Sequence, residues 1–488
     1  MMGFINYIID NTNKVILYVI TLALSLMVVY ISTRMGYKMG LVFAVLPFLV
    51  LTVIHLVRNP LHSFFLLFVF NYFVMGLSRY VKIISPGIAL DILMIGTIAF
   101  FVINALGKDS ELRFKDALNS ITLLSFIWFL YCMFQIFNPN MSSVVAWMTG
   151  VRNMGVYFLV VVVITSMVLR KFKRLEKFLM VWSILSILAV LKALYQKFVG
   201  FDIAELRWLY LEGGSVTHVL YYGIRYFSFF TDAANFGTGI GFSSVVFSLS
   251  ALFMKNRRLK VYYILVSALC FYGMIISGTR GSLAVPFVGY TLFVFISKKP
   301  KYMLLTFMLI ASSFIFLKYT HYGNGNTYIR RMRSAFDKDD ASLKVRLDNQ
   351  KRLRTYMWQY PFGIGIAMSR PNATTYEPNP VISKIPSDSW YVRVWMELGI
   401  VGLLLHLFIL LYILAKGSYI AFFKLKDEQL KGIVVAMLCG LAGVYIAAYS
   451  LEIIGQLPTS IIMFMCMTIA FISPVIDKEL QESKIDTT

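Results

Sequence analysis

Three arginines in this chain of 488 residues stand beside long apolar runs, where an unpaired charge is costly. Arg152 lies in "TGVRNMGVYF", Arg225 in "GIRYFSFFTDAANFG" and Arg280 in "SGTRGSLAV". A guanidinium presents a planar fork of donors that matches two phosphate oxygens, so three converging arginines could bracket a diphosphate. Arg280 has a simpler alternative, because a long cationic side chain at a helix end can also extend to the lipid headgroups.

The apolar runs that must position these arginines recur from end to end of the chain. The sequence is 59% hydrophobic and only 14% charged, and a run of roughly 17–25 apolar residues can cross a bilayer as a helix. We therefore predict an all-α polytopic membrane protein of about 12–14 transmembrane helices. The expected spans are roughly 15–32, 40–57, 61–77, 88–105, 118–136, 155–169, 178–199, 234–254, 261–277, 283–297, 302–318, 393–415, 432–450 and 457–474.

Short basic clusters between the runs set the expected orientation. The clusters "RKFKRLEK" (170–177), "KNRRLK" (255–260) and "KKPK" (298–301) should be cytoplasmic by the positive-inside tendency. This threading places both termini in the cytoplasm and leaves two long segments on the outer face, the first loop (200–233) and the second loop (319–392). The exceptions to the tendency, which fall on the outer side, are Arg34, Lys38, Arg79 and Lys82.

The same threading divides the chain into segments. Residues 1–140 form the N-terminal transmembrane helices, and residues 141–320 form the core helices together with the first loop. The second loop is large and partly helical. The C-terminal transmembrane helices occupy 393–476, and a cytoplasmic tail occupies 477–488.

The second loop contains eleven Lys and Arg residues against six Asp and Glu residues. Either this loop is a solvated surface or it faces an anionic substrate. Arg346, Gln350 and Arg354 recur at the spacing of one helical face. The four cysteines all lie inside apolar runs, without the spacing of a metal site or a disulfide framework. The acidic stretch "DKDD" (337–340) in the second loop could attract a cation, but we favour a solvated turn there and expect neither a metal nor another cofactor.

Four sequence blocks resemble one known family when they are taken in order. "RYFSFFTDAANFG" resembles an "R…G-x-F…N" segment, and "SGTRGSLAV" resembles an "S-x-S-R-G" signature. "YPFGIGI" (360–366) resembles a "P-x-x-G-x-G" element, and "SDSWYVRVWMELGIVGLLLHL" (387–407) resembles an "H-N-x-Y-L-x-x-x-x-E-x-G-x-x-G" block. These elements are those of the O-antigen ligase/polymerase superfamily, and the resemblance covers roughly residues 140–475.

The resemblance implies a GT-C-like glycosyltransferase that needs no metal. Such enzymes take a glycan from a polyprenyl diphosphate on the periplasmic face of the bacterial inner membrane and pass it to an acceptor hydroxyl. A polymerase of O-antigen, capsule or exopolysaccharide would use lipid-linked glycans as both donor and acceptor. Such an enzyme contacts membrane lipid and binds no nucleic acid. A chain-length regulator and a flippase are its possible protein partners.

The resemblance also assigns roles to residues of this sequence. Arg280 and Arg225 are expected to be catalytic, with Arg152 as a third ligand of the diphosphate. Arg346 matches an arginine upstream of "P-x-x-G-x-G" and either binds substrate or lies on a solvated helix face. Asp388 stands where the ligases have a histidine, so it is either the acceptor-side base or the cap of the following helix.

Three further residues are expected at the same site. Asp232 and Asn235 either bond sugar hydroxyls or orient Arg225. Glu452, in the last outer turn, should face a cavity because lipid would not tolerate its charge.

Two other functions remain open. The loss of the histidine favours a polymerase, but a ligase to lipid A core or a protein O-oligosaccharyltransferase stays within the family. A flippase or transporter for lipid-linked oligosaccharides would also have many spans and buried arginines. Such a transporter predicts charges near the middle of the bilayer and discontinuous helices, whereas the charges here gather at one face.

Overall fold

The computed structural model describes residues 50–82, 85–106, 112–220, 223–296, 300–337, 341–369 and 381–485, together with a few single residues before position 50. The expected span 15–32 lies almost entirely outside these residues, and the span 40–57 lies partly outside them. The chain separates into two compact units. Every candidate site residue belongs to the larger unit, which comprises Phe64–Ile98 and Ser110–Thr488.

The protein is an all-α polytopic membrane protein, as its composition predicts. Among the described residues, eleven helices are long and apolar enough to cross a membrane, and a twelfth apolar helix, Arg280–Ile296, is shorter. Every expected span from 61–77 onward has a helical counterpart. These helices are α3 (Pro60–Leu77), α4 (Pro86–Ala105), α5 (Ser120–Phe134), α6 (Val144–Val151), α7 (Tyr157–Val168), α8 (Phe172–Phe198), α11 (Ala233–Phe253), α12 (Arg257–Ile276), α13 (Ala284–Ile296), α14 (Pro300–Tyr319), α17 (Trp390–Phe423), α18 (Glu428–Ala447) and α19 (Thr459–Ile485).

One helix begins earlier than the sequence suggests. The span expected at 155–169 starts at Val144, because α6 continues through the π-helical turn η3 (Arg152–Val156) into α7. The apolar residues of α6 extend the same membrane-spanning segment. Arg152 therefore lies within a continuous helical segment and not at the end of a loop that precedes one.

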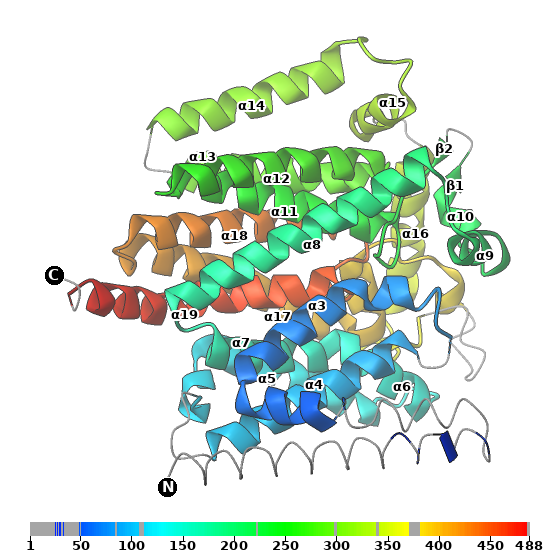
Figure 1. The fold of residues 1–488 in the computed structure, drawn as a ribbon. Helices are drawn as coiled ribbons and strands as arrows, with labels where there is room; N and C mark the ends of the chain where they lie inside the picture. The colour runs from blue at the N-terminus through cyan, green and yellow to red at the C-terminus, as the bar shows by residue number, and fades with distance from the viewer. Residues whose placement is uncertain are drawn as a thin grey trace, which may run out of the picture. The chain divides into compact units, whose positions relative to one another are not determined.

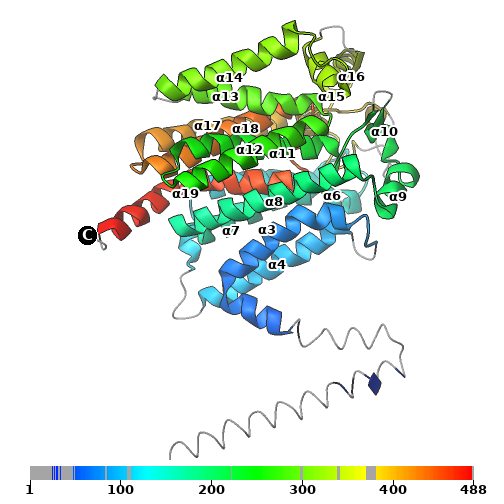
Figure 2. The ribbon, with the colours of Figure 1, turned by 45° about the horizontal axis from the view of Figure 1, so that its top comes forward.

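Both long loops contain secondary structure and lie at the same end of the helices in the larger unit (Figures 1 and 2). The first loop holds α9 (Ile203–Leu211), α10 (Ser215–His218) and an antiparallel pair of two-residue strands, β1 (Val219–Leu220) and β2 (Gly223–Ile224). The second loop holds α15 (Thr327–Arg333), η5 (Ser334–Phe336), α16 (Ala341–Met357) and η6 (Ile382–Lys384). The turn η4 (Arg280–Leu283) joins α12 to α13.

Two basic residues that break the positive-inside tendency anchor the first loop. Arg79 is 5% exposed, and its guanidinium donates to the carbonyl oxygens of Ser228 (2.9 Å) and Thr231 (3.3 Å). Lys82 forms an ion pair with Glu212 at 2.5 Å. Both residues therefore hold the first loop against the end of α3.

The "YPFGIGI" segment packs against a break in α17. Gly399 has a φ of 71° and a ψ of −174°, which interrupts the helix. The backbone N–H groups of Ile364 and Gly365 donate to the freed carbonyl oxygens of Met396 (2.9 Å) and Glu397 (3.1 Å). The two backbones lie so close that a Cβ atom on Gly399 would be 2.0 Å from the carbonyl oxygen of Pro361. The glycines of two of the sequence blocks are thus required by this contact.

We predict that Gly399→Ala lowers the free energy of unfolding by about 2–6 kcal/mol, the sum of backbone strain at a positive φ and overpacking. The thermal unfolding midpoint of the purified protein in detergent would measure this loss. Gly325→Ala is the matched control, because a Cβ there meets nothing within 4 Å. Equal midpoints for the two variants would contradict the close contact.

Candidate functional site

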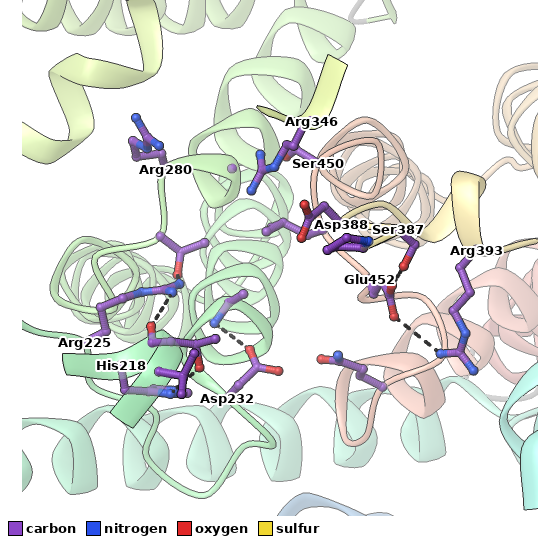
Figure 3. A pocket seen from close by; sticks show the side chains of 18 of the residues that line it. His218, Arg225, Asp232, Arg280, Arg346, Ser387, Asp388, Arg393, Ser450 and Glu452 are labelled. Atoms are coloured by element: carbon purple, nitrogen blue, oxygen red, sulfur yellow. Dashed lines mark hydrogen bonds and ion pairs between the residues drawn. The ribbon is translucent and has the colours of Figure 1, made fainter. Parts of the chain in front are cut away.

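A cavity of about 790 Å³ opens where the two loops meet the helix ends (Figure 3). Its walls come from the first loop, η4, α15, α16, the segment 383–388, α17 and the turn before α19. The cavity brings together six of the eight residues expected at the site: Arg225, Asp232, Arg280, Arg346, Asp388 and Glu452. Segments that are far apart in the sequence thus form one cavity.

Arg225 is held by neutral acceptors. One guanidinium nitrogen donates to the carbonyl oxygen of Thr217 (3.0 Å), and another donates to Thr279 Oγ1 (2.6 Å). Thr279 Oγ1 in turn donates to the carbonyl oxygen of Ala233 (3.0 Å). Nε of Arg225 is buried without a hydrogen-bond partner in the described part of the chain. Thr279, within the "SGTRG" block, therefore positions Arg225 against the start of α11.

Arg280 and Arg331 lie at the same turn. Arg280 is the first residue of η4, and its guanidinium donates to Ser334 Oγ (3.0 Å). Arg331, from α15, donates through Nε to the carbonyl oxygen of Gly278. Gly278 has a φ of 61°, and a Cβ there would lie 3.3 Å from Cγ of Arg225. Three guanidinium side chains from three elements therefore gather around the turn between α12 and η4.

Arg346 adds a fourth guanidinium from α16. Its helix is fixed by the buried side chains of Leu353 and Met357 and by a hydrogen bond from Tyr449 Oη to Gln350 Oε1 (3.4 Å). Of the helical face expected from the sequence, Arg346 lines the cavity, Gln350 contacts Tyr449, and Arg354 is exposed.

Charge repulsion acts within this group of arginines. Burial is the largest cause that lowers the pKa of Arg225, and the positive charges of Arg280 and Arg346 lower it further. The Asp232 carboxylate opposes them. An anion bound between these arginines would relieve the repulsion.

His218 and Asp232 fix the start of α11. Asp232 is the N-cap, and its Oδ1 accepts from the backbone N–H groups of Ala234 (2.7 Å) and Asn235 (2.9 Å). Nε2 of His218 accepts from the N–H of Ala233 (3.0 Å), while its Nδ1 lies 2.9 Å from the carbonyl oxygen of Gly214. This pairing requires the neutral tautomer with the proton on Nδ1. The two side chains thus hold the N-terminus of α11 beside the cavity.

The wall opposite Arg225 and Arg280 carries the carboxylates of Asp388 and Glu452, and we call it the carboxylate wall (Figure 3). Glu452 accepts from Ser387 Oγ, and its Oε2 lies 3.6 Å from a guanidinium nitrogen of Arg393. Arg393 also donates through Nε to Glu397 (3.1 Å), which accepts from Ser369 Oγ (2.6 Å). Arg393 and Glu397 are 4% and 0% exposed, so the pair is buried.

Asp388 lies on this wall in an unusual conformation. Its φ is 48°, in the left-handed region that few residues other than glycine adopt. The N-cap of α17 is Ser389, whose side chain accepts from the N–H of Val392 (3.5 Å). Asp388 therefore does not cap the helix, which removes the simpler of the two roles expected for it. Its exposed carboxylate lines the cavity.

Two of the expected residues do not line the cavity. Arg152 forms an ion pair with Asp91 of α4 at 2.6 Å, so the partner of its charge is an acid within the helices. Asn235 is fully buried, and its side-chain amide donates to the carbonyl oxygen of Leu457 (2.6 Å). Asn235 thus ties α11 to the turn before α19 instead of facing a ligand.

Sequence reasoning missed several lining residues. His218 had no assigned role, and Thr279, Arg331, Lys384 and Arg393 were not singled out. The ion pair of Arg393 and Glu397 could have been predicted from the sequence, because the two residues have i, i+4 spacing in an otherwise apolar stretch. The other contacts depend on loop folding, which has no comparable periodicity.

A second, apolar cavity of about 410 Å³ lies between α11, α12, α13 and α14. Leu283, the last residue of η4, lines it, whereas Arg280 and Gly281 at the start of η4 line the polar cavity. The two cavities are therefore adjacent across one short turn. The apolar residues that line the second cavity include Ile264, Phe271, Pro286, Phe287, Leu309, Ile310 and Leu317.

No group of three or more His, Cys, Asp or Glu side chains that could hold a metal ion occurs in the part of the chain that the structure describes. Of the acidic stretch "DKDD" (337–340), only Asp337 is described.

The fold and the cavity define a helical membrane protein with cations and carboxylates at one end of its bundle. Residues 265–407 match the family model described as O-antigen ligase. This match supports the resemblance of the four blocks to the O-antigen ligase/polymerase superfamily, whose members are membrane glycosyl-transferring enzymes. The matched region contains Arg280, Arg346 and Asp388, whereas Arg225 and Glu452 lie outside it. No curated protein matches the chain.

His218 should make the protein sensitive to acid. Burial lowers the pKa of His218 to about 4, although the neighbouring Asp232 carboxylate opposes the shift. The unfolded chain therefore binds a proton that the folded protein excludes between the two pKa values. Stability from this group is complete above about pH 6.5 and declines by about 2 kcal/mol on going from pH 7 to pH 5.

The thermal unfolding midpoint at pH 7 and pH 5 measures this effect. We expect His218→Gln to show a smaller drop between the two pH values than the wild type. His321→Gln, at an exposed position of the second loop, should keep the wild-type drop. Identical drops in all three proteins would show that His218 does not titrate as its burial requires.

Proposed function

We propose that this protein polymerises glycan repeat units carried on a polyprenyl diphosphate at the outer face of the bacterial inner membrane. The observation that carries the proposal is the position of η4 between the polar and apolar cavities. A lipid diphosphate has an apolar chain joined to a compact dianion. The apolar cavity suits the start of the chain, and Arg280 and Arg225 suit the diphosphate.

The proposed reaction uses the two walls of the cavity. The acceptor hydroxyl oxygen attacks the anomeric carbon of the donor glycan, while the glycosidic bond to the diphosphate breaks. Negative charge grows on the leaving diphosphate, so arginines that are already in place stabilise the transition state more than the ground state. Asp388 takes the hydroxyl proton, and attack opposite the leaving group inverts the anomeric centre.

Glu452 has a different role in this proposal. Its carboxylate is bonded to Ser387 and lies near Arg393, so it accepts hydrogen bonds from acceptor hydroxyls instead of taking a proton. Arg152 is left out of the diphosphate site because it forms an ion pair with Asp91. Arg346 lies between the two walls (Figure 3).

We expect Arg280→Ala and Arg225→Ala to abolish transfer by purified protein in vesicles supplied with lipid-linked repeat units and no ion gradient. Arg280→Lys and Arg225→Lys should rescue poorly, because a point charge does not reproduce the planar fork. Arg330→Ala, an exposed basic residue of the second loop outside the cavity, should retain wild-type activity. A ladder of products identifies a polymerase, and a single transfer identifies a ligase.

Near-normal turnover by both lysine variants would contradict the bidentate binding of a diphosphate. If wild-type protein moved the lipid-linked glycan across the membrane without lengthening it, the protein would be a transporter and not a transferase.

Asp388→Asn should lower the transfer rate about 10²–10⁴-fold, the usual contribution of a general base. Asparagine tolerates the left-handed backbone as well as aspartate does, so the variant should fold and accumulate normally. Asp388→His should keep weak activity, because histidine also tolerates this backbone and can accept a proton. The initial rate of product formation measures both effects, and an active asparagine variant would exclude Asp388 as the base.

A further inference from the structure

The polar cavity holds more cations than the leaving diphosphate requires. Six Lys and Arg side chains line it against three carboxylates, with His218 neutral. Two of the carboxylates are already engaged, since Asp232 caps α11 and Glu452 bonds Ser387 and lies near Arg393. The cations that line the cavity are Arg225, Arg280, Arg331, Arg346, Lys384 and Arg393.

These cations divide into two groups by their contacts. Arg225, Arg280 and Arg331 gather at the turn beside the apolar cavity, where the proposed diphosphate binds. Arg393 lies on the carboxylate wall and is paired there. Arg346 and Lys384 remain, and among the described residues the side chain of neither forms a hydrogen bond or an ion pair.

Both remaining cations are near the acceptor side of the site. Lys384 ends η6, four residues before Asp388 in the segment that lines this wall. Arg346 projects toward the space between Arg280 and Asp388 (Figure 3). A second lipid diphosphate on the acceptor would not reach them, because it is attached at the opposite end of the acceptor glycan from the attacking hydroxyl.

The surface outside the cavity continues this charge. Among the described residues of α16, Lys351, Arg352 and Arg354 are exposed cations and Asp348 is an exposed acid. A polymer with a repeating negative charge would meet favourable potential along this helix. A neutral polymer would gain nothing from it.

We infer that the glycan of this enzyme is acidic, and that Arg346 and Lys384 bind a carboxylate or phosphate substituent on the sugar next to the reacting hydroxyl. The inference rests on the proposed function and adds the class of its substrate. A guanidinium binds such a group through paired hydrogen bonds, and an ammonium adds a point charge.

The test uses the purified full-length protein and two free oligosaccharides of equal length, trigalacturonate as the acidic probe and maltotriose as the neutral one. Isothermal titration calorimetry should show binding of trigalacturonate that weakens with salt, and at least tenfold weaker binding of maltotriose. The double variant Arg346→Gln/Lys384→Gln should lose at least tenfold in affinity for trigalacturonate. The matched control, Arg207→Gln/Arg330→Gln, removes two exposed charges of the two loops that lie outside the cavity and outside α16, and should stay within twofold of the wild type.

Equal affinity for the two probes would overturn the inference, as would unchanged binding by the cavity double variant. Equal losses in both double variants would also overturn it, because the binding would then belong to the general surface charge. The probes carry neither lipid nor diphosphate, so the result is independent of transfer. Protein that binds trigalacturonate through the cavity pair but transfers no lipid-linked glycan would refute the proposed function alone.

Discussion

A guanidinium buried among membrane helices must have an anionic or carbonyl partner, and Arg393 meets this requirement with two carboxylates that join distant segments. It pairs with Glu397 one turn further along α17 and lies within ion-pair distance of Glu452 in the turn before α19. Through Glu397 it is also linked to Ser369, three residues after the "YPFGIGI" segment. Removing one partner of such a buried pair typically costs about 3–5 kcal/mol, so the carboxylate wall depends on it.

The other wall of the cavity, which carries Arg225 and Arg280, is held by neutral hydrogen-bonding groups. Arg225 is held by a carbonyl oxygen and by the hydroxyl of Thr279, and no described carboxylate lies within ion-pair distance of it. His218, kept neutral by burial, holds the start of α11 without adding charge. Arg393 on one wall thus pairs with carboxylates, whereas Arg225 on the other wall is held by neutral groups. This asymmetry gives the two walls different chemistry.

The larger unit's helices and part of the site follow from the sequence, for reasons that particular residues illustrate. Long apolar runs locate the helices because bilayer thickness sets their length. Arg225 and Arg280 could be identified from the sequence because an unpaired charge beside an apolar run is costly. Arg152 looked equivalent, yet its partner Asp91 is on another helix, and no local pattern reveals such a pairing. Thr279 and the left-handed Asp388 depend on loop conformation, which apolar periodicity does not encode.

The short turn η4 has a consequence for how substrate would reach the enzyme. One end of the turn lines the polar cavity, and the other end lines the apolar cavity, which is bordered by α14. Only 6% of the residues in the apolar stretch of α14 are buried. A ligand that occupies both cavities would enter sideways from the bilayer. Its supply is then governed by its mole fraction in the membrane, so diluting the vesicles with inert lipid would lower occupancy at constant bulk concentration. The affinity of such an enzyme for its substrate should therefore be expressed relative to the surface density of the substrate in the membrane.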